Sequence, residues 1–132
     1  MVAAFIIASA ATVSATAAPI ALPALPEPVS NNAVASVTIE DTQYVFSFMG
    51  LGKGKTHKDV HNRAWQLPID SKDKPLQWQD LPPVPSSLAL KGRLASVAVG
   101  VNDSVYIFGG YTVDEEHNEI STWYFVVLWD TL

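Results

Sequence analysis

The chain has no cysteine among its 132 residues, and only 16% of its residues carry a charge. The absence of cysteine excludes a disulfide framework, a cysteine-ligated zinc ion and a cysteine nucleophile. Eight basic residues face thirteen acidic ones, which gives a formal net charge of −5, and the basic residues form no cluster. Because a nucleic acid partner requires neutralisation of its phosphates, this balance predicts that the chain binds no nucleic acid.

Charge is also missing from the beginning of the chain, where no charged residue precedes Glu27. Residues 1–17 combine an apolar run, Val2–Ile7, with small residues, and they end in the small-x-small pattern of signal cleavage, Ala15–Ala17. We therefore expect export to the periplasm or out of the cell, with cleavage after Ala17, although the basic residues that normally begin a signal peptide are lacking. An uncleaved membrane helix is the alternative, which the weakly hydrophobic composition and the prolines that follow disfavour.

An internal repeat is visible when residues 33–46 (AVASVTIEDTQYVF) are aligned without a gap to residues 95–108 (ASVAVGVNDSVYIF). Each copy has two runs of alternating character around a short polar turn, which contains Glu40-Asp41 in the first copy and Asn102-Asp103 in the second. Such turn residues favour tight hairpins, so each copy predicts a β-hairpin. The small side chains that alternate along residues 96–100 indicate that another sheet packs closely on the second hairpin.

The chain continues after the first hairpin with two further strand patterns. Residues 63–70 (RAWQLPID) predict a third strand, and residues 76–82 (LQWQDLP) predict a fourth, in which Trp78 is placed to pack on its neighbours. Four consecutive antiparallel strands with an aromatic anchor are typical of a propeller blade. The sequence therefore predicts an all-β fold.

The second unit resembles a kelch repeat. Its signature begins with Arg93 and an apolar strand and continues with the segment VYIFGGY, in which Tyr106 belongs to an aromatic-rich strand and the double glycine Gly109-Gly110 follows that strand. In the first unit the resemblance is looser, because Ser47-Phe48 align with the double glycine. An unrelated all-β domain with a chance pair of glycines is the alternative.

Two further features resemble the kelch family. Asp70 followed by Trp78 is similar to the aspartate, turn and tryptophan of its blades, and residues 80–93 (DLPPVPSSLALKGR) resemble its proline-rich crossover. The resemblance covers about residues 31–112. It implies a first blade (31–85) and an incomplete second blade (86–132), and these follow the signal-like segment (1–17) and a proline-rich extended lead-in (18–30).

The expected export makes bacterial periplasmic kelch proteins, of the N-acetylneuraminate epimerase (sialic-acid mutarotase) type, the relatives that the chain resembles in architecture. The resemblance implies a small carbohydrate ligand over the central channel, with no cofactor. It makes Arg93 and its repeat-mate Asn31 candidate substrate-binding residues, because both stand at the entrance of an inner strand. The alternative for Arg93 is a structural role, in which it binds the backbone of the crossover.

The chain is short for a propeller, because kelch units run to about 50 residues and propellers close with roughly 4 to 8 blades. Residues 126–132 (VVLWDTL) match a third strand of the second unit. We expect an N-terminal fragment, produced by truncation or a frameshift, that is poorly folded or self-associates through its unpaired blade face. Three functions stay open: a sugar epimerase or mutarotase, a non-catalytic kelch interaction module, and a nonfunctional gene fragment.

Two motifs that point to other chemistry do not fit their templates. A phosphate-binding loop ending in Gly54-Lys55-Thr56 requires a glycine at position 49, which is methionine, so no nucleotide is expected. His57 and His61 have the spacing of a zincin pair, but Lys58 stands where that motif has glutamate, so no metal is expected. We interpret the whole segment as the loop between the second and third strands of a blade.

Overall fold

The computed structural model describes residues 19–69, 75–86, 92–121 and 125–128. The signal-like segment and Asp70 lie outside this part of the chain. The described elements are strands, apart from one 3-10 turn, η1 (His57–Asp59), so the predicted all-β fold is confirmed. None of the helical structure in the described ranges is long and apolar enough to cross a membrane.

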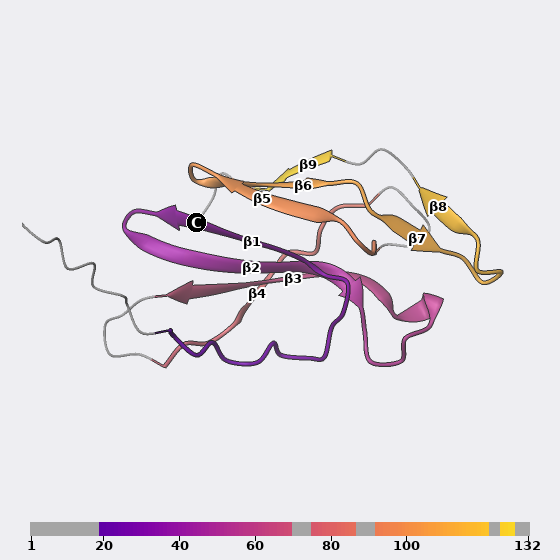
Figure 1. Cartoon of the computed structure of the whole chain (residues 1–132), viewed down its shortest axis with the longest axis horizontal. Coiled ribbons are helices and arrows are strands. Elements are labelled where there is room, and N and C mark those ends of the chain that lie inside the picture. Colours follow the sequence, from indigo (N-terminus) through magenta and orange to yellow (C-terminus); the bar gives the residue numbers. More distant parts are fainter. Residues whose placement is uncertain (1–18, 70–74, 87–91, 122–124, 129–132) are drawn as a thin grey trace, which may run out of the picture.

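The first sheet is an antiparallel meander of four strands in the order β1–β2–β3–β4 (Figure 1). Its register pairs Ala33 with Phe48 and Ile39 with Thr42, and places Phe48 opposite Ala64 on the third strand. The sheet matches the four strands that the sequence predicts, although the third begins earlier and the fourth is shorter. The strands are β1 (Ala33–Ile39), β2 (Thr42–Leu51), β3 (Val60–Ile69) and β4 (Gln79–Leu81).

The second unit is divided into two smaller sheets. Strands β5 (Val97–Val101), β6 (Ser104–Phe108) and β9 (Phe125–Leu128) form one antiparallel sheet in the order β5–β6–β9. The third strand predicted near residue 126 is therefore present. Strands β7 (Tyr111–Val113) and β8 (Glu119–Ser121) form a separate hairpin that the sequence pattern did not predict.

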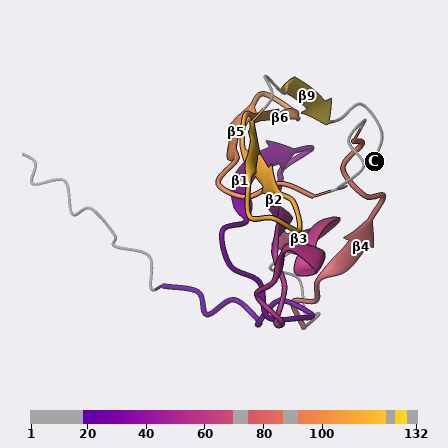
Figure 2. The same ribbon diagram turned by 90° about the vertical axis from the view of Figure 1, so that its right-hand side faces the viewer.

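The first and second sheets lie face to face, with β5 and β6 above β1 and β2 in both views (Figures 1 and 2). The contact is close because Gly100 has no side chain, and a Cβ atom at this position would collide with the carbonyl oxygen of Ser36. Small residues on one face of the second hairpin therefore allow the expected close packing of a neighbouring sheet. The core between the sheets contains apolar residues from both units: Ala33, Ala35, Val37, Phe46, Phe48, Val105 and Ile107.

The proline-rich lead-in is attached to the first sheet and runs along β3 and β4 (Figure 1). The indole N–H of Trp78 donates a hydrogen bond of 3.0 Å to the carbonyl oxygen of Pro23. Arg63 Nη1 lies 2.7 Å from Glu27 Oε1, which ties the same segment to β3. The lead-in is thus held by the Trp78 indole and by an ion pair.

Both units break their second strand with two residues in left-handed backbone conformation. Met49 and Gly50 have φ angles of 56° and 120°, and Gly109 and Gly110 have φ angles of 63° and 86°. The residue after each pair bridges back to a residue that lies just before the first strand of its unit. Leu51 pairs with Ser30, before β1, and Tyr111 pairs with Leu94, before β5. Met49-Gly50 is therefore the structural counterpart of the double glycine.

This equivalence corrects the gapless alignment. Ser47 and Phe48 precede the left-handed pair and have no positive φ angle, so they do not replace the double glycine. Asn31 and Ala95 both have left-handed φ angles, 55° and 53°, immediately after the bridging residues, so Asn31 is the counterpart of Ala95 and not of Arg93. The reason is strand length, because β1 has seven residues and β5 has five. When the two copies are aligned at their hairpin turns, the residues before β1 and β5 are therefore shifted by two positions.

We expect the two glycines of the second unit to differ sharply in their tolerance of alanine. Gly109→Ala should lower the free energy of unfolding by about 1–2 kcal/mol, the cost of a left-handed alanine, because no atom lies within 4 Å of the new Cβ. Gly110→Ala should cost about 2–5 kcal/mol, because its Cβ also collides with Ser96 Oγ. Urea unfolding of both variants measures the difference, and equal losses would contradict this geometry.

Removal of the Trp78 hydrogen bond should loosen the lead-in. Trp78→Phe keeps an aromatic ring but removes the N–H that binds Pro23, so we expect a loss of about 1 kcal/mol of unfolding free energy. Limited proteolysis within residues 19–28 should become faster than in the unsubstituted chain. Unchanged cleavage in that range would show that the bond does not hold the segment.

Candidate functional site

The antiparallel order brings several loops and strand ends of both units to one end of the molecule. The β2–β3 loop with η1 and the β7–β8 hairpin lie at the right-hand end in Figure 1. The start of β1 is at the same end, where Asn31 O accepts a hydrogen bond of 3.2 Å from the Ala95 N–H. We call this surface the rim; it consists of residues 52–59, residues 114–118, Asn31 and Ala95.

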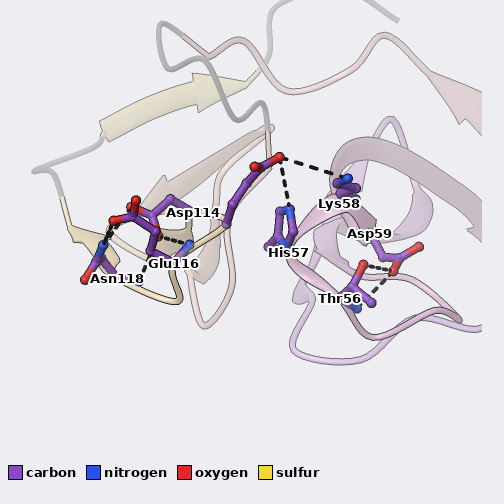
Figure 3. A network of polar contacts seen from close by, with 8 residues as sticks. Thr56, His57, Lys58, Asp59, Asp114, Glu116 and Asn118 are labelled. Carbon is purple, nitrogen blue, oxygen red and sulfur yellow. Dashed lines mark hydrogen bonds and ion pairs between the residues drawn. The ribbon is translucent and has the colours of Figure 1, made fainter.

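Two loops of the rim meet through charged side chains (Figure 3). His57 Nε2 lies 3.7 Å from Glu115 Oε1, and Lys58 Nζ lies 4.0 Å from the same oxygen. The first unit therefore touches the second at its β2–β3 loop as well as through the core. The contact with His57 is an ion pair only when the imidazole is protonated.

Each of these loops is shaped by a carboxylate (Figure 3). Asp59 Oδ2 accepts hydrogen bonds from the Thr56 hydroxyl, at 2.6 Å, and from the Thr56 N–H, at 2.9 Å, and these bonds hold the pKa of Asp59 below its ordinary value. Asp114 accepts from the N–H groups of Asn118 and Glu116, and the pKa of Asp114 is lowered chiefly by its bonds with Asn118. Both carboxylates are therefore ionised near neutral pH, and the N–H of Thr56 is occupied by Asp59.

Arg93 precedes the bridge between Leu94 and Tyr111 and is buried, with only 2% of its surface exposed. Its Nη1 donates a hydrogen bond of 3.2 Å to the carbonyl oxygen of Gly110, and Ser96 Oγ donates one of 3.1 Å to the carbonyl oxygen of Gly109. Arg93 therefore binds the backbone of the double glycine, which is a structural contact of the kind that the alternative interpretation proposed. Asn31 is exposed on the rim. A substrate-binding role for either residue stays a prediction.

The other signature residues lie away from the rim. Tyr106 is half-buried in β6, opposite Val99. Trp78 precedes β4 and contacts the lead-in. Among the described residues no group of three or more metal-ligating side chains occurs. His61 places its ring edge-on to Trp65, with the ring centroids 5.7 Å apart.

A pocket of about 590 Å³ lies between the lead-in and strands β3 and β4. Its charged and amide groups come from Glu27, Asn62, Arg63 and Asp80, and the Arg63 guanidinium lies 5.9 Å from the centre of the Trp65 ring. Sequence reasoning missed this pocket, because nothing in the strand pattern showed that the lead-in docks. The one available signal was Glu27, the first charge of the chain, within an otherwise uncharged segment.

His61 is half-buried beside this pocket. Neither ring nitrogen has a hydrogen-bond partner within the described ranges. Burial lowers the pKa of His61, the positive charge of Arg63 lowers it further, and the charge of Glu27 opposes the shift. The folded chain therefore favours the neutral imidazole.

No protein-family model and no curated protein sequence matches the chain. A solved structure to which the chain is similar is that of YjhT, with 20% identity and a TM-score of 0.49. The match covers 81% of this chain and 29% of the YjhT chain, so this chain spans less than a third of the length of YjhT. The described part of the chain is an all-β unit of antiparallel sheets with two to four strands.

The lowered pKa of His61 predicts a loss of stability in mildly acidic solution. As the pH falls through about 6.5, the ordinary value for histidine, the unfolded chain takes up this proton before the folded chain does, so the free energy of unfolding decreases. His61→Gln should remove that part of the decrease. The contributions of Asp59 and Asp114 are lost in a separate window, below about pH 4.

Denaturant unfolding between pH 8 and pH 5 measures the effect. Parallel curves for the parent chain and His61→Gln would contradict the inference.

Proposed function

We propose that the chain forms two neighbouring blades of an exported kelch-type propeller, and that the complete protein handles a sugar as a mutarotase or epimerase of the sialic-acid type. The observation that carries the kelch part is the break shared by the two units. In each, a hairpin ends in a left-handed pair, and the following residue bridges back to the entrance of the inner strand. The second pair is the double glycine by which the sequence resembles the family.

The double glycine has a physical reason in this arrangement. Gly109 and Gly110 both have positive φ angles, which glycine adopts without the cost that other residues incur. Their carbonyl groups are held by Ser96 and Arg93, so the turn of the chain is fixed from the interior. Because a buried arginine binds the glycine pair, the pair is better interpreted as a kelch turn than as two adjacent glycines that occur by chance.

The polar groups at the rim and in the pocket beside the lead-in support the sugar part of the proposal. A sugar offers many hydroxyl groups, and carboxylate, amide and guanidinium groups supply the matching acceptors and donors. Mutarotation needs a base that takes the proton of the anomeric hydroxyl and an acid that protonates the ring oxygen as the ring opens. His57 and Glu115, which face each other across the two units, are groups of that type.

A non-catalytic interaction module is the second candidate. It is favoured by one observation: β5 exposes three valines, Val97, Val99 and Val101, on one face. Exposed apolar surface of this kind marks sites of protein contact. Under this candidate the rim binds no sugar and the propeller acts through its surfaces.

Exchange between the anomers of sialic acid, followed by NMR, separates the two candidates. We expect the complete propeller protein to accelerate exchange by roughly 10²-fold or more, the range of general acid–base catalysis. Residues 1–132 alone should not accelerate it, because a ligand over a central channel requires the remaining blades. A folded complete protein that leaves the exchange at its uncatalysed rate would remove the enzyme proposal and leave the interaction module.

A further inference from the structure

The pocket beside the lead-in contains two opposite charges that do not pair with each other. Arg63 of β3 and Asp80 of β4 both line it. The register places Asp80 opposite Trp65, and Arg63 stands two residues before Trp65, so Arg63 and Asp80 are diagonal neighbours on one face of the sheet. Such neighbours have backbone positions about 7–8 Å apart. Among the described residues the ion pair of Arg63 is with Glu27, so the pocket keeps a cation and an anion a short distance apart.

The guanidinium of Arg63 is held in place and still has donors to offer. Its Nη1 lies 2.7 Å from Glu27 Oε1, and its central carbon lies 5.9 Å from the centre of the Trp65 ring, within the range of a cation–π contact. An arginine has five N–H donors, and this side chain is 52% exposed, so N–H groups remain for a ligand. The docked lead-in therefore fixes a cation that can receive an anionic group without reorganisation.

The carboxylate of Asp80 is the group in the pocket without a partner. Within the described ranges it takes part in no hydrogen bond and no ion pair. Water satisfies an exposed carboxylate in most proteins, so this observation alone would define no site. Its place in a pocket, diagonal to a fixed guanidinium, gives Asp80 a role as the acceptor for a ligand that also carries an anion. An ammonium group, with three N–H donors, is the complement of that acceptor.

The remaining lining gives the pocket an apolar wall. Pro26, Leu81, Pro83 and the indole of Trp65 contribute to it, and the volume of about 590 Å³ is within the range of small-molecule sites. The amide and carboxylate groups of the pocket would also suit the hydroxyl groups of a sugar. A neutral sugar, however, leaves the charge of Asp80 without a counter-charge, whereas a ligand with both signs compensates it. The lining therefore favours a small ligand that has two opposite charges and an apolar side chain.

We propose that this pocket binds a zwitterion of the α-amino acid class, whose carboxylate accepts hydrogen bonds from Arg63 and whose ammonium group donates to Asp80. Every charge then has an opposite charge beside it, in the order Glu27, Arg63, ligand carboxylate, ligand ammonium and Asp80. The apolar side chain of the ligand lies against the prolines and Leu81. The site belongs to the first sheet and the lead-in alone, so the inference goes beyond the sugar chemistry proposed for the rim and does not depend on it.

Calorimetric titration of residues 1–132 with L-leucine tests the proposal. We expect saturable binding of leucine, and binding weaker by roughly tenfold or more for N-acetyl-leucine, which lacks the ammonium charge, and for leucinamide, which lacks the carboxylate. A short peptide carries the same two charges at its termini, further apart. Titration with leucyl-leucine therefore distinguishes the two sources of this chemistry, because the tighter of the two ligands has the spacing that the pocket fits.

Asp80→Asn tests the proposed partner of the ammonium group. Because Asp80 is exposed, this variant should fold like the parent, bind leucine roughly tenfold or more weakly, and bind N-acetyl-leucine no more weakly than the parent does. Asp41→Asn is the matched control. It removes the same charge from an exposed turn outside the pocket lining, where asparagine tolerates the left-handed φ of 66°, and it should leave the affinity unchanged.

Equal binding of leucine, N-acetyl-leucine and leucinamide would overturn the proposal, and so would equal effects of Asp80→Asn and Asp41→Asn. Displacement of leucine by sialic acid or by a neutral sugar would assign the pocket to the sugar chemistry and overturn it as well. The midpoint of urea unfolding gives a second measurement: millimolar leucine should raise it for the parent and not for Asp80→Asn, and an unchanged parent midpoint would contradict binding. Anomer exchange by the complete protein is measured separately, so failure of this inference and failure of the proposed function are distinguishable.

Discussion

The close approach of β5 to β1 at Gly100 is the contact on which the rest of the structure depends. Because a side chain at this position would strike the Ser36 carbonyl, the two inner strands can lie together only with glycine there. Their proximity allows the larger side chains, Phe46 and Phe48 from one sheet and Ile107 from the other, to close a shared core. It also brings the Ala95 N–H to Asn31 and Glu115 to His57, so the polar rim is a consequence of apolar packing.

The left-handed pairs act as a second constraint, because they interrupt the regular strand pairing shortly before the chain enters the rim loops. In the first unit Gly50 occupies a crowded position against Val29 and the Ser30 carbonyl, where an added Cβ would lie 2.6 Å and 2.8 Å from the nearest atoms. In the second unit Gly110 is crowded by Ser96 and bound by Arg93. A charge buried as deeply as that of Arg93 is retained in a folded protein only where polar partners replace water, and the Gly110 carbonyl is one of them.

The hairpins, the four-stranded first sheet and the third strand of the second unit could be predicted because their signals are local. Alternation of side chains and polar turn residues depends on neighbouring positions alone. The two-residue slip between the copies could not be predicted, because alignment favours the identical Tyr44 and Tyr106 near the turns and is insensitive to strand length beyond them. The docking of the lead-in depends on Trp78 reaching Pro23, a contact 55 residues apart that no local pattern records.

The charged residues of the candidate site could likewise be predicted from local sequence, whereas the contacts between them could not. The sequence shows that residues 52–59 and 114–118 are polar loops, and the spacing of His57 and His61 directs attention to a metal pair. Folding instead turns His57 toward Glu115 of the second unit and His61 toward Trp65 of its own strand. The chemistry of this end of the molecule therefore arises between units, because each unit contributes one loop and neither loop contains the whole set. A repeat protein that adds further units around the same inner strands would multiply such pairs, which is how a scaffold with few charges can still assemble a polar site.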